Sequence, residues 1–362
     1  MRVIHSLAWY FPESKAGTET YVSQLVRELS TIGVDSTVVA ARDGAESDSY
    51  VHEGIEVFRY PVNENPKLDQ LRGRRPYGGF EVFSEWLKTQ RADIYHQHSF
   101  NGGCGLHHLR EAKSLGLKTV MTVHMPNCVC LRGTMMFRGK TACDGNIERN
   151  RCGACWGMSR GLPKPVASAA SRLPMFLSKR ADSVDLSLFT IIATPSLVEA
   201  HRNQLKELSN LADRIVVISR WLYDALSIND VPQEKLVLSH TGGPANGHTP
   251  VIKSSSSSLR LGFLGRCTKD KGLHVLIRAL RQLPPDVPIQ LVVYALKGGD
   301  GEAEYEADVR QSASKDSRIS FKDPVDRGAV FKTLQTFDLL AIPSQCMETG
   351  PLVALEAHAA GV

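Results

Sequence analysis

The chain has 362 residues, of which 42% are hydrophobic and 22% are charged, and its formal net charge is +5. This length predicts two or three domains, the composition is that of a globular protein, and the modest charge argues against nucleic acid as a partner. The first residues, MRVIHSLAWYFPES, break their apolar run at Pro12, and no apolar run approaches the ~20 residues of a membrane span. We therefore expect a cytoplasmic protein without a signal peptide.

Short apolar segments alternate with amphipathic helical patterns along the chain, which predicts parallel sheets with crossover helices. The candidate strands of the first half are residues 2–9, 35–41, 55–61, 92–98, 117–124, 213–219 and 235–240. The first helix is predicted from five residues that share one face, Val22, Leu25, Val26, Leu29 and Ile32.

A segment rich in Pro, Gly and Ser, residues 244–258, has the composition of a flexible linker. A second series follows it, with strands at 259–265, 289–296 and 337–343 and a helix over 271–283. The predicted architecture is thus α/β, with two Rossmann-like doubly wound domains, residues 1–243 and 259–362, facing each other across a cleft.

Three features of the first half lie at predicted strand ends. Gly17 follows the first strand, where glycine lets backbone N–H groups approach a phosphate or sugar closely. His96 and His98 share one face of a strand and could bind a metal, but we find no third ligand and interpret them as packing and cleft-lining residues. His124 ends the next strand; such a histidine is most often a hydrogen-bonded core residue, but this one lies where the cleft is expected.

The segment LRGRRP carries Arg72, Arg74 and Arg75. These cations could meet an anionic lipid headgroup or a phosphate, which would bring the protein to the inner face of the membrane as a peripheral protein. We interpret the segment instead as a solvated loop.

Five cysteines, Cys128, Cys130, Cys143, Cys152 and Cys155, occur within 28 residues, against three elsewhere in the chain. In a reducing compartment such density suggests metal rather than disulfides. Four of them, Cys130, Cys143, Cys152 and Cys155, can be drawn as one tetrahedral structural zinc site over the insertion 128–155. Free thiols and an iron–sulfur cluster are the alternatives.

The second half opens with LRLGFLGRCTKDKG, which places Arg266 and Lys271 between a strand and a helix. Two cations beside a helix N-terminus form a clamp for a diphosphate, and they would stabilise a leaving nucleoside diphosphate without a catalytic metal. The absence of any D-x-D pair from the sequence fits such a reaction. A solvated basic loop is the alternative interpretation.

Near the end, ETGPLVALEA places Glu348 and Glu356 eight residues apart across a Gly-Pro break. One carboxylate follows a strand and the other lies in the next helix, at the sheet edge where α/β proteins bind ligands. The alternative explanation is that these acidic residues at a helix start only interact favourably with the helix dipole.

Taken in order, these motifs resemble those of the GT4 family of retaining glycosyltransferases, which have the two-domain GT-B fold. The resemblance implies that Arg266 and Lys271 hold the donor diphosphate and that Gly350 to Leu352 present N–H groups to it, Pro351 itself offering none. It further implies that Glu348 and His124 contact the sugar from opposite walls and that Glu356 contacts the ribose. The cysteine segment resembles an insertion found in a subset of the family.

The resemblance implies transfer from a nucleoside diphosphate sugar to an acceptor, with a glycan or a lipid-linked acceptor expected. Only 104 residues follow the linker, and each βα unit takes ~30 residues, so we expect the second domain to be incomplete. Two alternatives remain, namely a nucleotide-sugar-binding homologue with little turnover and a non-enzymatic module that docks a partner through its cysteine loop.

Overall fold

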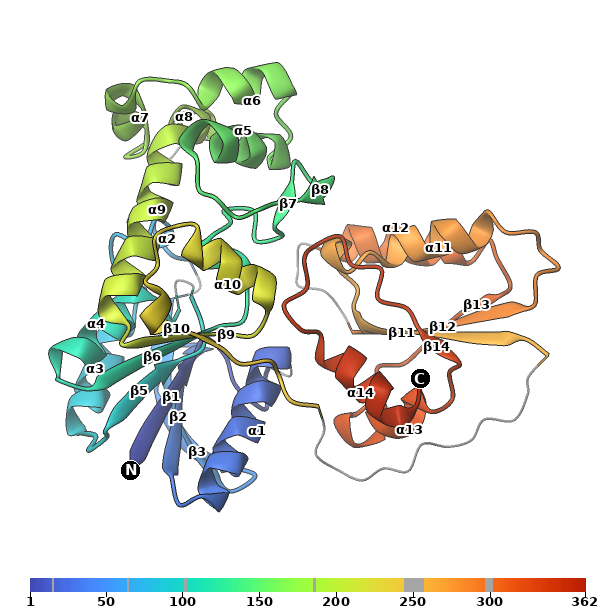
Figure 1. Cartoon of the computed structure of the whole chain (residues 1–362), viewed down its shortest axis with the longest axis horizontal. Coiled ribbons are helices and arrows are strands. Elements are labelled where there is room, and N and C mark those ends of the chain that lie inside the picture. The colour runs from blue at the N-terminus through green and yellow to red at the C-terminus, as the bar shows by residue number, and fades with distance from the viewer. Residues whose placement is uncertain (15, 64, 101–102, 185–186, 244–256, 297–301) are drawn as a thin grey trace. The chain divides into compact units, whose positions relative to one another are not determined.

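The computed structural model describes residues 1–362 except residues 15, 64, 101–102, 185–186, 244–256 and 297–301. It divides into two compact units, Met1–His240 and Thr241–Val362, and each unit has its own parallel or mainly parallel sheet (Figure 1). Most of the linker predicted at residues 244–258 lies outside the described residues. No helix in the described part of the chain is long and apolar enough to cross a bilayer.

The first unit is built on an eight-stranded sheet with the strand order β10-β9-β6-β5-β1-β2-β4-β3. Its strands are β1 (Arg2–Leu7), β2 (Asp35–Asp43), β3 (Asp48–His52), β4 (Ile55–Val62), β5 (Ile94–Gln97), β6 (Lys118–Val123), β9 (Arg214–Val217) and β10 (Leu236–Leu238). Neighbouring strands run parallel except β3 and β4. The edge strand β3 is not among the predicted strands, because its residues DSYVH contain no apolar run.

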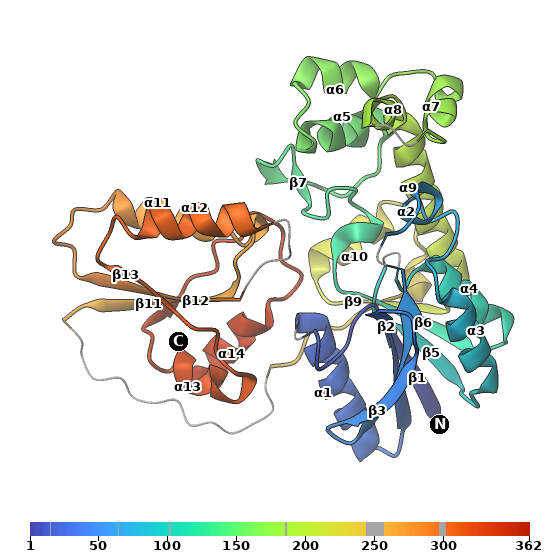
Figure 2. The ribbon, with the colours of Figure 1, turned by 180° about the vertical axis from the view of Figure 1, so that it is seen from behind.

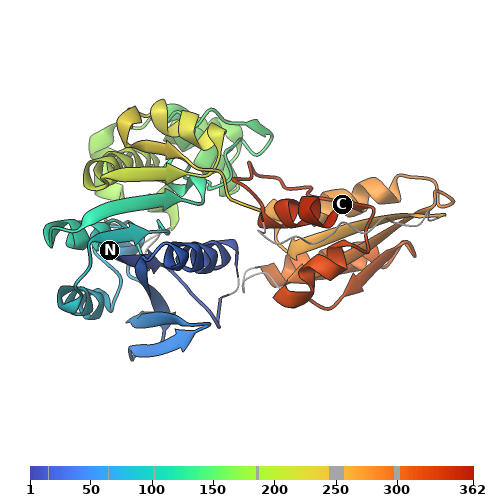
Figure 3. The same ribbon diagram turned by 60° about the horizontal axis from the view of Figure 1, so that its bottom comes forward.

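The connecting helices of this unit are α1 (Gly17–Thr31), α2 (Leu68–Leu71), α3 (Phe80–Thr89), α4 (Leu106–Ser114), α9 (Thr194–Leu211), α10 (Arg220–Ser227) and the 3-10 turn η2 (Gln233–Lys235). Figures 1 and 3 show α1 beside the blue strands of the sheet. Val22 and Val26 lie one helical turn apart and join Leu7 and Val57 in a core cluster. Ile32, expected on the same face, caps the helix and is exposed.

A lobe is inserted between β6 and α9 and stands off the sheet (Figures 1 and 2). It comprises η1 (Pro126–Cys128), the hairpin β7 (Met136–Phe137) and β8 (Thr141–Ala142), and the helices α5 (Arg149–Ser159), α6 (Lys164–Ala170), α7 (Met175–Ala181) and α8 (Ser187–Ile192). We call it the insertion lobe. Its core is small: Trp156 and Ala181 pack there with Ala193 and Leu197.

The second unit has a four-stranded parallel sheet in the order β13-β12-β11-β14. Its elements are β11 (Leu259–Arg266), η3 (Lys269–Lys271), α11 (Leu273–Arg281), β12 (Ile289–Leu296), α12 (Ala303–Ala313), β13 (Ile319–Lys322), η5 (Arg327–Ala329), α13 (Val330–Leu334), β14 (Leu339–Leu340) and α14 (Leu352–Ala360). Figure 2 shows α11 and α12 on one face of this sheet and α13 and α14 on the other. This is the doubly wound arrangement that the sequence predicts.

Two predicted boundaries in this unit differ from the structure. The helix expected over 271–283 begins at Leu273, because Gly272 adopts a left-handed conformation that caps it. The strand expected over 337–343 pairs only at Leu339–Leu340, where it meets Leu261 and Gly262 of β11.

Candidate active site

Each sheet contains one topological switch point, where successive strands are added first on one side of a strand and then on its other side. In the first sheet β1 lies between β2 and β5, and in the second sheet β11 lies between β12 and β14. In open α/β sheets, ligands bind at the carboxyl ends of the strands next to such a point. The predicted site residues of each unit follow those strands or their immediate neighbours.

In the first unit, four histidines meet at the carboxyl ends of β1, β5 and β6. His5 of β1 is in register with His96 of β5, and its Nδ1 lies 3.1 Å from Nε2 of His98. Nδ1 of His98 in turn lies 3.2 Å from Nε2 of His124. The Nε2 atom of His96 lies 2.7 Å from the Thr122 hydroxyl oxygen. The sequence showed no third potential metal ligand beside His96 and His98, but in the structure β1 supplies one in His5.

Burial keeps these imidazoles neutral. It lowers the pKa of His5 to about 3 and the pKa of His124 to about 4. The pKa values of His96 and His98 fall well below the ordinary range, first because of burial and then because of the neighbouring imidazoles. Within the described residues, His5, His96 and His98 are the one set of three potential metal ligands whose ligand atoms all lie within 4.8 Å of one another.

Gly17 is the first residue of α1, and Ala16 is its N-cap. Sequence reasoning missed Glu19 in the first turn of this helix, a carboxylate that is 5% exposed. The Ser14 hydroxyl donates to its Oε1, and Oε2 has no hydrogen-bond partner among the described residues. The ring of Tyr21, two residues after Glu19, meets the ring of His124 edge-on at 4.7 Å between centroids.

In the second unit, the structure brings Lys271 and Glu348 together. Lys271 follows β11 and donates from Nζ to Glu348 Oε1 over 2.7 Å. Ser344, after β14, donates from its hydroxyl to the same oxygen over 2.5 Å. The Lys271 and Glu348 side chains are 26% and 23% exposed, so the ion pair lies at the surface of the sheet's carboxyl edge, within reach of a ligand.

Two glycines fix the backbone beside this pair. Gly272 has φ +72°, and a Cβ there would lie 2.0 Å from the carbonyl oxygen of Pro343. Gly350 has φ +145° and precedes Pro351, the N-cap of α14. Only glycine adopts these conformations without strain. The loops after β11 and β14 therefore approach each other closely at this point.

The remaining predicted donor residues lie around the pair. Arg266 ends β11 and is exposed. Leu352 opens α14, so the first N–H groups of that helix have no partner inside it. Glu356 lies in α14, where burial raises the pKa of its carboxyl while Arg327 opposes that rise.

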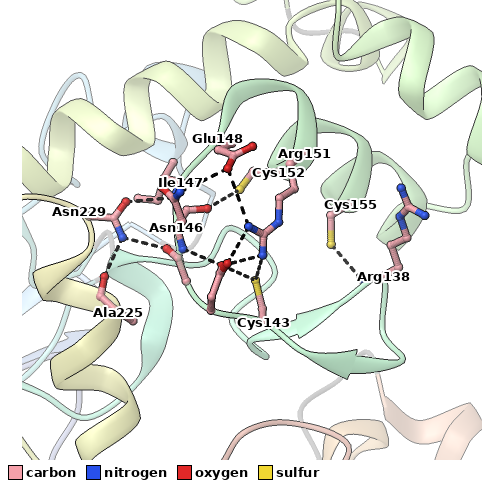
Figure 4. Close-up of polar contacts among 12 residues, drawn as sticks. Arg138, Cys143, Asn146, Ile147, Glu148, Arg151, Cys152, Cys155, Ala225 and Asn229 are labelled. Carbon is pink, nitrogen blue, oxygen red and sulfur yellow. Dashed lines mark hydrogen bonds and ion pairs between the residues drawn. The ribbon is translucent and has the colours of Figure 1, made fainter.

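The four predicted metal-ligand cysteines line one cavity in the insertion lobe. Cys152 and Cys155 lie three residues apart on α5, while Cys130 and Cys143 flank the β7–β8 hairpin. Figure 4 shows the side chains of Cys143, Cys152 and Cys155 around this hairpin. Arg151 donates to Cys143 Sγ over 3.3 Å.

Backbone contacts also reach this cavity. The Arg138 N–H lies 3.1 Å from Cys155 Sγ. Asn229, after α10, accepts a hydrogen bond from the Ile147 N–H over 2.9 Å and donates one to the Gly145 carbonyl over 2.8 Å. The base of the lobe is therefore fixed to the first sheet's last helix. Burial raises the pKa of the Cys152 thiol to about 11.

The basic segment LRGRRP is only partly a solvated loop. Arg72 and Arg74 both pair with the buried carboxylate of Asp182 in the insertion lobe, so they are structural. Arg75 is exposed and lines a cavity of about 200 Å³ together with Gln70, His107, Asn127 and Gln204.

Comparisons with known proteins place this geometry in context. A family model described as a glycosyl transferase 4-like domain matches residues 16–184, and one described as glycosyl transferases group 1 matches residues 250–362. No curated protein matches the chain.

Solved structures resemble the whole chain at low sequence identity. Anabaena HepE in complex with UDP and glucose is 14% identical, with a TM-score of 0.60. The sucrose-phosphate synthase of Thermosynechococcus elongatus is 16% identical, with a TM-score of 0.61; for both, the match covers 100% of this chain and 79% of the other. An E. coli trehalose-6-phosphate protein bound with UDP-2-fluoro glucose is 12% identical, with a TM-score of 0.58 and coverage of 99% and 82%. At such identities the likeness shows a shared fold, which confirms the predicted fold class.

Proposed function

The chain belongs to the group 1 glycosyltransferases, and on that premise we propose that it transfers a sugar from a nucleoside diphosphate sugar to an acceptor with retention at the anomeric carbon. Three of the solved structures it resembles contain UDP, UDP-glucose or a fluorinated UDP-glucose. We propose a nucleotide sugar of this kind as the donor for this chain.

The observation that carries the proposal is the Lys271–Glu348 pair beside the N-terminus of α14. In the proposed complex the donor diphosphate accepts hydrogen bonds from Lys271, Arg266 and the free N–H groups of Gly350 and Leu352. Lys271 then bridges two anions, the diphosphate and Glu348. This arrangement holds Glu348 at a fixed place where it can contact the sugar, while Glu356 contacts the ribose.

Retention follows in this proposal because the diphosphate departs from, and the acceptor attacks, the same face of the sugar. The leaving diphosphate takes the proton of the attacking acceptor hydroxyl on the face from which it departs. The cations and helix N–H groups stabilise the charge that grows on the diphosphate. No protein nucleophile and no catalytic metal is needed for this step.

Calorimetry with UDP and with GDP, each with and without EDTA, tests the donor site. We expect one nucleotide to bind with the same affinity under both conditions. Lys271→Ala should weaken binding about tenfold or more, as the loss of a hydrogen bond to a charged group implies. Lys269→Ala is the matched control, because this exposed lysine belongs to the same 3-10 turn. Absence of binding by both nucleotides, or binding lost with EDTA, would contradict the proposal.

Turnover separates the enzyme from a binding homologue. If the protein binds a nucleotide sugar but releases no nucleoside diphosphate in the presence of mixed glycan and lipid-linked acceptors, the alternative of a homologue with little turnover gains support. For the acceptor we propose the cavity lined by Arg75, where one exposed cation and several amide side chains suit a hydroxyl-rich molecule with an anionic group. Arg75→Ala should raise the acceptor KM and leave the donor affinity unchanged.

We also propose that Cys130, Cys143, Cys152 and Cys155 hold one structural zinc ion in the insertion lobe. Four observations support it: all four line one cavity, two project from one helix at i, i+3, a backbone N–H points at Cys155 Sγ, and the lobe has a small apolar core. No three of these sulfur atoms lie within 4.8 Å of one another in the structure. Zinc binding would therefore have to draw them together and replace the Arg151–Cys143 contact.

Elemental analysis of gently purified protein tests the zinc proposal. We expect close to one zinc per chain in the wild type and its loss in Cys152→Ser. Cys128→Ser is the matched control, because this buried cysteine of the same lobe does not line the cavity. Rapid reaction of all four thiols in a metal-free native protein would contradict zinc, and visible absorbance with bound iron would indicate a cluster instead.

A further inference from the structure

The three hydrogen-bonded histidines of the first unit form a chain that ends at His124. His5 is completely buried and His98 is 2% exposed, and the backbone N–H of His98 donates to the Ser6 carbonyl over 2.7 Å, which fixes its position. The two ring-to-ring distances, 3.1 Å and 3.2 Å, are those of hydrogen bonds. Each contact therefore needs one ring N–H and one bare ring nitrogen.

Counting protons leaves two arrangements. Because burial keeps the three rings neutral, each carries one proton. In the outward arrangement, His5 Nδ1–H donates to His98, His98 Nδ1–H donates to His124 Nε2, and the proton of His124 is on Nδ1. In the inward arrangement, every bond is reversed and the proton of His5 is on Nε2.

The surroundings of His5 decide between the two. Its Nε2 is buried and has no hydrogen-bond partner among the described residues. The inward arrangement would bury an N–H without an acceptor, whereas the outward one leaves a bare nitrogen there. Buried donors without acceptors are the rarer defect in proteins. The outward arrangement is therefore favoured.

We infer that His5 and His98 act as positioning residues that hold His124 as the Nδ1–H tautomer, so that His124 offers a hydrogen-bond donor and not a base. If the proposed function holds and His124 faces the transferred sugar, the acceptor of this N–H is a sugar hydroxyl or ring oxygen. Its Nε2 is already occupied by His98 and cannot take the proton of the attacking acceptor. This part of the inference rests on the proposed function; the tautomer itself does not.

A metal on His5, His96 and His98 is the competing arrangement, since their ligand atoms lie within 4.8 Å of one another. A metal bound between His5 Nδ1 and His98 Nε2 would displace the hydrogen bond that joins them. It would also use the lone pair that the outward arrangement assigns to His98 Nε2. The two arrangements therefore give different nitrogen spectra.

Long-range ¹H–¹⁵N correlation spectra of protein labelled in its histidine rings test the tautomer directly at pH 7.5, without donor or turnover. We expect His124 to carry its proton on Nδ1 in the wild type, with signals assigned through their loss in His124→Gln. His98→Leu, which removes the donor to His124 Nε2, should shift His124 away from this tautomer, whereas His201→Gln, at a buried histidine outside the hydrogen-bonded trio, should leave it unchanged. A wild-type His124 protonated on Nε2 would overturn the inference even if His98→Leu fails to fold. A change of these signals on adding Zn²⁺ or EDTA would do so as well.

Turnover of two isosteres tests the role at the sugar. An Asn amide can place its N–H near the position of Nδ1, while a Gln amide reaches the position of Nε2. We expect His124→Asn to keep at least tenfold more kcat than His124→Gln. Equal losses in both, with the Nδ1–H tautomer seen in the spectra, would refute the contact with sugar and leave the tautomer standing.

Discussion

The candidate site residues of the two units are built from opposite kinds of electrostatics. In the first unit, neutral imidazoles bond to one another, and those of His5 and His98 are buried in the sheet. In the second unit, a lysine and a glutamate of opposite charge remain about one quarter exposed at the ends of loops. Protonation would therefore disrupt the histidine cluster of the first unit, whereas the loss of a charge would disrupt the ion pair of the second.

This difference reflects how the geometry of each unit arises. Strand register aligns His5 with His96, and His98 and His124, which directly follow β5 and β6, complete the histidine cluster. The Lys271–Glu348 pair instead depends on two loops that meet at Gly272, where a side chain would clash with the Pro343 carbonyl. A buried cluster resists rearrangement, whereas an exposed ion pair can exchange one partner for the charge of a ligand. We therefore expect the site residues of the two units to respond to different perturbations.

The largest expected effect is acid destabilisation of the first unit. The folded pKa values of His5 and His124, about 3 and about 4, lie below the ordinary 6.5. Below pH 6.5 these histidines bind protons in the unfolded chain but not in the folded unit. Their contribution to the free energy of unfolding is therefore fully present above pH 6.5 and is lost as the pH falls. At pH 5, each such histidine lowers the free energy of unfolding by about 2 kcal/mol.

Tryptophan fluorescence can follow this unit alone, because Trp9, Trp86, Trp156 and Trp221 all lie in Met1–His240. We expect the urea midpoint seen by fluorescence to fall strongly between pH 7.5 and pH 5. Circular dichroism, which sees both units, should show a second transition that moves less. An unchanged fluorescence midpoint would contradict the buried neutral cluster.

The next effect concerns the charge pair of the second unit. Glu348→Ala should lower transfer about a hundredfold or more, the size expected when one group that acts on developing charge is removed. The same change releases Lys271 from its anionic partner, so nucleoside diphosphate affinity should stay the same or rise. Transfer assays and calorimetry on one preparation measure both, with the exposed Glu304→Ala as control. A parallel loss of nucleotide binding would show that Glu348 only supports the fold.

Much of this site could be predicted from the sequence, and what was missed has physical causes. Lys271 and Glu348 stand out because each follows an apolar strand in a parallel sheet, and such ends gather at one edge. His5 could not be recognised as the third imidazole, because it lies inside an apolar strand and becomes a partner only through strand order. Ser344 and Glu19 were missed for a similar reason: their roles depend on loop and helix positions that no local pattern specifies.

A backbone substitution tests the dependence on loops. Gly272→Ala should destabilise the second unit by about 2 kcal/mol or more, since a left-handed conformation costs ~1–2 kcal/mol for alanine, and its Cβ would also clash with the Pro343 carbonyl. Gly33→Ala shares the positive φ but has open space around it, so it should show the conformational cost alone. Urea unfolding of both variants, followed by circular dichroism, gives the comparison. Equal losses would mean that the approach of the two loops is not constrained at Gly272.

The smallest effect is expected from substitution of Glu356, which should raise the stability of the protein and lower its affinity for the donor. Burial raises the pKa of this carboxyl above its ordinary 4.5. Between 4.5 and the raised value the folded protein binds more protons than the unfolded chain, so stability falls as the pH rises through that window. The penalty is complete above the folded pKa and is lost below 4.5.

Glu356→Gln removes this penalty, so the variant should be slightly more stable than the wild type at pH 7.5. Donor affinity should fall about tenfold, as the loss of a charged partner for ribose hydroxyls implies, while kcat at saturating donor changes little because those contacts persist from the ground state to the transition state. In the wild type, donor affinity should also decline as the pH falls toward the raised pKa of Glu356. Such a pH dependence should be absent from the variant. A variant that is less stable and loses kcat in proportion to affinity would instead identify Glu356 as a structural residue of α14.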